Sequence, residues 1–268
     1  MPLFNSLVPP IAHNWLLTTF LLSVRLSVLF MLTPVLNGNL LPAPARMIIV
    51  LALAATLAAS LPSSAANQSI DGSNIFGAVL NEVVIGLAFA LGVSLVFAAF
   101  QLAGGLLDVQ IGYGIAEIFD PVTRRTLPVL SSAFNQLGVL IFFALDGHHA
   151  LLRLVALSLH LLPPGQILLG TGDIGGLTAI LFKPLLHLIS TTFWLGFAIV
   201  APVVFCLLLA EFTFGVMARN FPQINMFIIA VPMKIVIGLA VLALWLGSAG
   251  NIMSRLIASM FDMWSGLL

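Results

Sequence analysis

Charged residues are scarce in this sequence, because only 7% of its 268 residues are Asp, Glu, Lys or Arg. Soluble domains carry about 25% charged residues, so an ordinary soluble globule is excluded. Nine basic and nine acidic residues give zero net charge, which leaves no basic field for the phosphates of a nucleic acid. Cysteine is nearly absent too: Cys206 is the single one in the sequence and has no partner for an internal disulfide.

Long uncharged stretches take the place of the missing charges, and 61% of the residues are hydrophobic. A helix needs about 20 apolar residues to cross the hydrocarbon core of a membrane. Four gaps between successive charges meet this length: Glu82 to Asp108, Arg125 to Asp146, Lys183 to Glu211, and Lys234 to Arg255. Shorter or interrupted candidates lie at 15–36, which contains Arg25, and at 47–61. We therefore predict about six membrane-type helices.

The fold class follows from the membrane setting, where every backbone polar group needs an internal partner. Only helices and closed barrels achieve this, and the apolar stretches lack the period-2 alternation of barrel strands. We predict an all-α protein arranged as hairpins. Prolines lie within or beside most of the stretches, among them Pro202 and Pro232, so we expect partly broken helices. Sparse interfacial aromatics and weakly biased loop charges favour a surface that meets other proteins as well as lipid.

Two helix faces indicate close packing. Small residues recur at every fourth position along one face, at Gly86, Ala90, Ser94 and Ala98, where another helix of the same chain is expected to approach. The C-terminal stretch is amphipathic, with one apolar face and only Arg255 as a cation on the other. It could lie on the membrane surface, but it lacks the basic face of a lipid-seeking helix, which favours a protein groove at least as much, so we predict a contact with another subunit. The residues expected in this contact are Met253, Leu256, Met260 and Trp264.

No catalytic constellation is visible. Asp146, His148 and His149 are metal-ligand types, but neighbouring histidines on a helix point in different directions and no further ligand stands at a companion spacing. We expect a turn there, with Asp146 capping a helix from 148 to 162. The predictions are therefore no enzyme, no cofactor and no metal.

The segment 104–125 is different, because it combines glycines with alternating charges directly after an uncharged stretch. Glycine supplies torsional freedom, and carboxylates at membrane depth usually mark a pathway. Three interpretations stay open at this point: a surface or re-entrant loop, a movable element of a conduit, and an ion or proton relay through Asp108, Glu117 and Asp120.

Three ordered blocks carry a resemblance to a known family. They read AGGLLDVQIGYGIAEIFDP at 103–121, FFALDGHHALLRLVALSLHLLPPG at 142–165, and MARNFPQINMFIIAVPMKIVIGL at 217–239. Together they resemble the FliR family of flagellar export proteins. The matching signature residues are Arg25, Pro34, Pro42, Arg46, Pro121, Gly147, His148, His149, Arg219, Pro222, Gln223, Asn225 and Phe227.

The resemblance implies a subunit of the flagellar type III export gate in the bacterial inner membrane, at the basal body. It implies assembly with FliP and FliQ, contact with FlhB and indirectly FlhA, and passage of unfolded flagellar proteins. It also implies one domain over 1–268, FliP-like to about residue 180 and FliQ-like beyond. A loop that obstructs the closed pore is implied around 106–120. Its residues are Leu106, Leu107, Asp108, Gln110, Gly112, Tyr113, Gly114, Glu117, Phe119 and Asp120.

Three alternatives remain beside this interpretation. The injectisome counterpart, the SctT family, shares the Gly-Leu-Leu-Asp and Asp-Pro features, whereas the Gly-His-His string at 147–149 favours the flagellar branch. An ion- or proton-coupled transporter would use the three carboxylates of segment 104–125. A membrane enzyme would use the two adjacent histidines.

Overall fold

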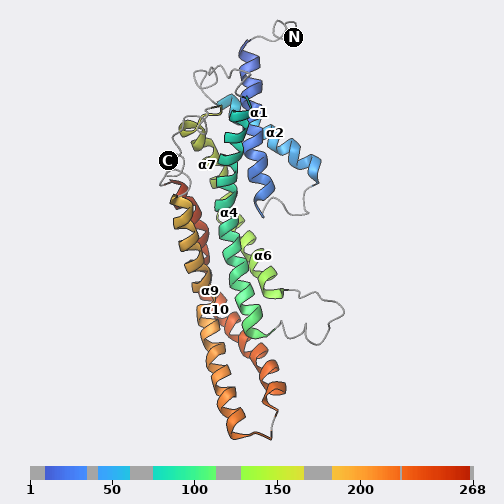
Figure 1. Cartoon of the computed structure of the whole chain (residues 1–268), viewed down its shortest axis with the longest axis vertical. Coiled ribbons are helices and arrows are strands. Elements are labelled where there is room, and N and C mark those ends of the chain that lie inside the picture. Colours follow the sequence, from blue (N-terminus) through green and yellow to red (C-terminus); the bar gives the residue numbers. More distant parts are fainter. Residues whose placement is uncertain are drawn as a thin grey trace. The chain divides into compact units, whose positions relative to one another are not determined.

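The computed structural model describes residues 10–34, 42–60, 75–112, 128–165, 183–223 and 225–265, and in these residues it contains helices and no strand. The predicted all-α fold class is confirmed. Figure 1 shows the elements coloured along the sequence. The helices are α1 (Pro10–Leu32), α2 (Ala43–Ser60), α4 (Ile75–Ile111), α6 (Val129–Ala144), α7 (Gly147–Leu161), α9 (Lys183–Asn220) and α10 (Met226–Ser265).

The helices match the uncharged stretches of the sequence. Five of them, α1, α2, α4, α9 and α10, are long and apolar enough to cross a membrane, and a sixth span results if α6 and α7 count as one. The expectation of broken helices is wrong for two prolines, because α9 continues through Pro202 and α10 through Pro232. The Trp245 indole N–H of α10 donates to the Ile199 carbonyl of α9 at 2.7 Å and joins the two helices.

The chain forms two compact units that alternate along the sequence. Unit 1 contains residues 1–94, 149–188 and 260–268, and unit 2 contains residues 95–148 and 189–259. The division does not coincide with a boundary near residue 180. The predicted single domain with a FliP-like and a FliQ-like part stays a prediction.

In unit 1 the predicted stripe of small residues is where α4 packs against α1. A Cβ added at Gly86 would lie 2.7 Å from the Arg25 carbonyl oxygen, so no larger residue fits at this approach. Ser94 Oγ donates to the Leu32 carbonyl at 3.0 Å, and Ala90 is buried. The prediction of close packing within the chain is confirmed from Gly86 to Ser94, whereas Ala98 is exposed.

A buried ion pair holds three helices of unit 1 together. Arg25 of α1 donates through Nε to Glu82 Oε2 of α4 at 2.6 Å. Its Nη1 donates to Ser158 Oγ of α7 at 3.0 Å, and its Nη2 donates to the Leu162 carbonyl at 3.0 Å. Both charged side chains are fully buried. We call these groups the Arg25 cluster.

The Arg25 cluster accounts for a charge inside an apolar span. A lone buried charge is very costly, and a paired one with further hydrogen bonds is tolerated. The guanidinium group donates hydrogen bonds to one carboxylate, one hydroxyl and one carbonyl. These directional bonds fix the relative positions of α1, α4 and α7 more strictly than apolar contacts do.

The core of unit 2 is aromatic. The rings of Phe97 and Phe142 lie 6.0 Å apart with an edge-on geometry, and those of Phe97 and Phe100 lie 6.5 Å apart. Gly138 of α6 leaves room for the Phe100 ring, because an added Cβ would lie 2.9 Å from it. In the same unit α9 and α10 run side by side as an antiparallel pair, as Figure 1 shows.

Replacing Arg25 or Glu82 singly by Met should lower the free energy of unfolding by about 3–5 kcal/mol, because the remaining charge is buried without its partner. The double variant should be less destabilised than the sum of the singles. Thermal unfolding of the purified chain in detergent measures this. Strictly additive losses would show that the two charges are not coupled.

Candidate functional site

Asp108, near the end of α4, caps the start of α6. Its Oδ1 accepts the Leu130 N–H at 3.0 Å and its Oδ2 accepts the Ser131 N–H at 2.9 Å. The first N–H groups of a helix have no partner within that helix, and Pro128 at the N-cap position makes no side-chain cap bond. The buried carboxylate of Asp108 therefore supplies the missing cap from another helix and meets the positive end of the α6 dipole. We call this contact the Asp108 clamp.

A glycine allows the Asp108 clamp to form. A Cβ added at Gly104 would lie 2.4 Å from Ser131 Cα and 2.5 Å from the Leu130 carbonyl oxygen, a distance that forces the backbones apart. Ser131 Oγ also donates to the Gln101 carbonyl at 3.1 Å. The last two turns of α4 are thus fastened to the first turn of α6.

The predicted loop at 106–120 is wrong in its first half. Leu106, Leu107, Asp108 and Gln110 belong to the last turns of α4, which ends at Ile111. The helix α4 continues through Gly104 and Gly105, and Gly104 lies directly against the first turn of α6. Gly112 adopts φ 95 and its N–H donates to the Asp108 carbonyl, which is a glycine helix end. The remaining predicted residues, Tyr113, Gly114, Glu117, Phe119, Asp120 and Pro121, lie outside the described residues.

A second polar contact joins α4 to the helix pair α9 and α10 in unit 2. Glu211 Oε1 accepts from Lys234 Nζ at 3.3 Å, and Glu211 Oε2 accepts from Gln110 Nε2 at 3.3 Å. The Glu211 side chain is 55% exposed and that of Lys234 is 16% exposed. An exposed ion pair within membrane-type helices is unfavourable in lipid, so this seam is expected to face protein or water. Sequence reasoning missed Glu211 and Lys234, because both served only as the ends of uncharged gaps.

The signature near residue 220 forms the turn between α9 and α10. Pro222 and Gln223 lie in the turn itself. The Phe227 N–H donates to Asn225 Oδ1 at 3.2 Å, so Asn225 caps the start of α10, as asparagine at an N-cap does. Arg219, at the end of α9, and Phe227 are exposed. Part of the signature thus makes the turn, and part has no packing role in the described residues.

The helices beside this turn are apolar and exposed. Phe212 is 72% exposed, and every described residue from 211 to 223 is exposed except the half-buried Phe214. In α10 only 6% of the residues in the most apolar window of 18 are buried. A helix that is hydrophobic all round requires a membrane or a protein partner. We call residues 205–236 the hairpin tip.

The remaining signature residues have separate local roles. Pro34 follows the end of α1, and Pro42 precedes α2, where its carbonyl accepts the Arg46 N–H at 3.2 Å. Arg25 belongs to the Arg25 cluster described above.

The Asp-Gly-His-His segment makes the turn that sequence reasoning expected. Asp146 lies directly before α7 with φ 54, and α7 runs from Gly147 to Leu161, close to the predicted 148–162. A Cβ at Gly147 would lie 2.6 Å from the Phe142 ring, and the His148 ring lies 5.5 Å from that of Phe143. Ligand atoms of Asp146 and His148 lie within 4.8 Å of each other, so the absence of a metal stays a prediction.

The C-terminal apolar face is enclosed by the chain itself. Met253, Leu256 and Met260 are all buried, and the side chain of Trp264 lies outside the described ones. The amphipathic pattern is thus satisfied within the chain and does not need a partner. A subunit contact through these residues stays a prediction, and their burial disfavours it.

Comparison with known families was made for the whole chain. The model of the bacterial export proteins, family 1, matches residues 16–260. The chain belongs to this family. The match covers α2, α4, α6, α7 and α9 entirely, with most of α1 and α10, so the Asp108 clamp and the hairpin tip both lie inside the bacterial export protein domain.

Individual relatives in the bacterial export family point the same way. The flagellar biosynthetic protein FliR of Escherichia coli (strain K12) is 24% identical over 95% of this chain and 94% of the relative. FliR of Bacillus subtilis (strain 168) is 27% identical over 83% of each. The secretion system apparatus protein SsaT of Salmonella typhimurium is 28% identical over 62% of this chain and 61% of the relative. The resemblance to the FliR family is confirmed.

Replacing Asp108 by Asn should loosen the first turn of α6, because an amide offers one acceptor oxygen where two backbone N–H groups need acceptors. Losing a charged hydrogen bond costs about 1.5–3 kcal/mol, so exchange at the Leu130 and Ser131 amides should accelerate about ten-fold or more. Hydrogen exchange with mass spectrometry measures this. The exposed carboxylate of Asp262 provides the matched control, Asp262→Asn. Unchanged protection at α6 in Asp108→Asn would contradict the clamp.

Proposed function

We propose that this chain is a FliR-type subunit of a flagellar protein export gate in the bacterial inner membrane. It performs no bond chemistry and forms, with FliP and FliQ, the pore through which unfolded flagellar proteins pass. FlhB contacts the assembled gate, and FlhA acts indirectly. The family match and the FliR relatives support the export role.

The exposed hairpin tip is the observation that carries this proposal. It is long, apolar and almost uncovered by the rest of the described chain. Lipid alone does not account for it, because Glu211, Lys234 and Arg219 lie on the same helices and charges facing hydrocarbon are costly. Neighbouring subunits cover an apolar surface and also supply polar partners for such charges. The hairpin tip thus has the composition of a subunit interface.

The Asp108 clamp gives the proposed pore a fixed point. The sequence between Gly112 and Pro128 joins the two helices that the clamp fastens. We assign the obstruction of the closed pore to residues 113–127, a segment that begins later in the sequence than 106–120.

The transporter alternative is disfavoured by Asp108. Both of its carboxylate oxygens accept backbone N–H groups of α6, so the side chain is already used as a helix cap. The enzyme alternative would rest on Asp146 and His148, which lie together at the start of α7, whereas the family match supports an export role. An injectisome gate subunit is the second candidate, because SsaT matches part of the chain.

Replacing Phe212 and Phe227 by Ser should reduce recovery of the FliP- and FliQ-like proteins when this chain is purified from membranes. The two substitutions remove large apolar side chains that the chain itself leaves exposed, so its own folding should be unaffected. The measurement is the amount of each partner per copy of this chain after affinity purification.

The control is Leu140→Ser, which removes an apolar side chain that is 67% exposed on α6 and lies outside the hairpin tip. Partner recovery should stay at the wild-type level in this variant. Equal recovery in all three proteins would overturn the assignment of the hairpin tip to a subunit interface.

A further inference from the structure

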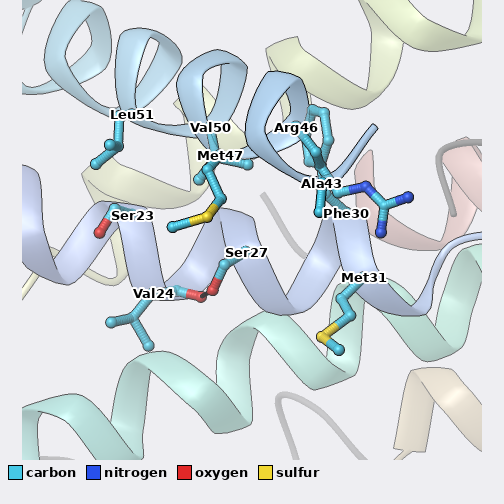
Figure 2. Close-up of a pocket in the computed structure, with 10 residues that line it drawn as sticks. All are labelled: Ser23, Val24, Ser27, Phe30, Met31, Ala43, Arg46, Met47, Val50 and Leu51. Atoms are coloured by element: carbon cyan, nitrogen blue, oxygen red, sulfur yellow. Dashed lines mark hydrogen bonds between the residues drawn. The ribbon is translucent and has the colours of Figure 1, made fainter. Parts of the chain in front are cut away.

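A groove lies between α1 and α2 in unit 1, away from the Arg25 cluster. It encloses about 340 Å³, near the lower end of the roughly 300–1,000 Å³ of small-ligand sites. Figure 2 shows the side chain of Met47 extending from α2 toward Ser27 of α1, across the groove. The ten lining residues are Ser23, Val24, Ser27, Phe30, Met31, Ala43, Arg46, Met47, Val50 and Leu51.

The lining is suited to a hydrocarbon chain. Phe30 and Val50 form a buried floor, whereas Met31, Met47 and Leu51 are more than half exposed and make an open rim. The two hydroxyls do not seek a polar ligand, because Ser23 Oγ donates to the Phe20 carbonyl at 2.6 Å and Ser27 Oγ donates to the Val24 carbonyl at 2.8 Å. The groove therefore offers apolar contact along most of its length.

One end of the groove carries a cation. Arg46 is the only charged residue among the ten that line it, and no carboxylate is among them. In Figure 2 Arg46 lies beside Phe30 and Ala43, at the opposite end from Leu51 and Ser23. Arg46 belongs to the first turn of α2, whose membrane-type stretch begins at Ala43. An arginine at the end of a span reaches the headgroup level of the bilayer.

We propose that this groove binds one anionic phospholipid, with an acyl chain between α1 and α2 and the phosphate at Arg46. Basic pockets between membrane helices recognise anionic headgroups in this way. The inference is independent of the flagellar assignment, since it needs only a membrane setting.

A second cavity shows why the charge matters. It encloses about 280 Å³ between α6 and α10 in unit 2, and every residue lining it is apolar. Nothing in that cavity distinguishes lipid from a protein side chain. The α1–α2 groove differs by its single cation at one end.

The test uses the full-length chain, purified in mild detergent with any subunits that accompany it. Native mass spectrometry counts bound lipid while dioleoyl phosphatidylglycerol or dioleoyl phosphatidylcholine is added. The wild type should bind one phosphatidylglycerol about five-fold more tightly than phosphatidylcholine, the ratio expected of one arginine near the membrane surface. Equal affinity for the two lipids would overturn the proposal.

Two kinds of variant separate recognition of the lipid headgroup from binding of its acyl chain. Arg46→Gln should lower phosphatidylglycerol affinity to that of phosphatidylcholine, whereas the matched control Arg153→Gln, an exposed arginine of α7, should keep the preference. Ser27→Trp, which fills the groove from an exposed position, should remove binding of both lipids, and Leu51→Trp repeats this from the other helix. Binding that survives both tryptophans would show that the lipid lies elsewhere.

Two further arms distinguish other occupants. Inorganic phosphate at the same concentration should not displace phosphatidylglycerol, and displacement would mean that the site recognises a free anion. In intact membranes, Ser27→Cys should not cross-link to another protein. A protein cross-link together with loss of the lipid preference would assign the groove to a subunit contact. Lipid binding is measured whether or not gate subunits co-purify. A failure of the lipid proposal can therefore be distinguished from a failure of the proposed function.

Discussion

The first turn of α6 contains backbone N–H groups that its own helix leaves unpaired, and Asp108 of α4 accepts two of them. Few polar side chains are available in this chain to accept these N–H groups, so the cap comes from a residue of another helix. The carboxylate can reach α6 only because Gly104 lets the two backbones approach. This contact fixes the start of α6 against the end of α4. It therefore holds together the two ends, Gly112 and Pro128, of the sequence that joins these helices.

Several charged side chains among the described residues join helices. Arg25 and Glu82 fasten α1, α4 and α7, and Glu211 links α10 to α4 through Lys234 and Gln110. The apolar side chains of the hairpin tip, in contrast, remain uncovered by the described chain. A protein that uses its polar groups internally and leaves long apolar helices exposed is suited to assembly with other membrane subunits.

The sequence predicted the helices well and their tertiary contacts poorly. Gaps between charges located the spans because hydrocarbon excludes charge, and the expected start of α7 was within one residue of the observed Gly147. The end of α4 was misjudged, because the glycines at 104 and 105 read as a flexible segment when their neighbours are unknown. The prolines misled as well, because α9 and α10 continue through Pro202 and Pro232. The pairing of Arg25 with Glu82 spans 57 positions, and no local pattern encodes it.

We propose that residues 113–127, which follow the Asp108 clamp in the sequence, close the pore of an export gate. Ion conductance across membranes that contain the assembled gate tests it most directly, comparing wild type with a chain lacking residues 115–119. The account predicts that the shortened chain still assembles with its partners and that the membrane becomes leaky to small ions. An assembled gate that stays as tight as the wild type would contradict it.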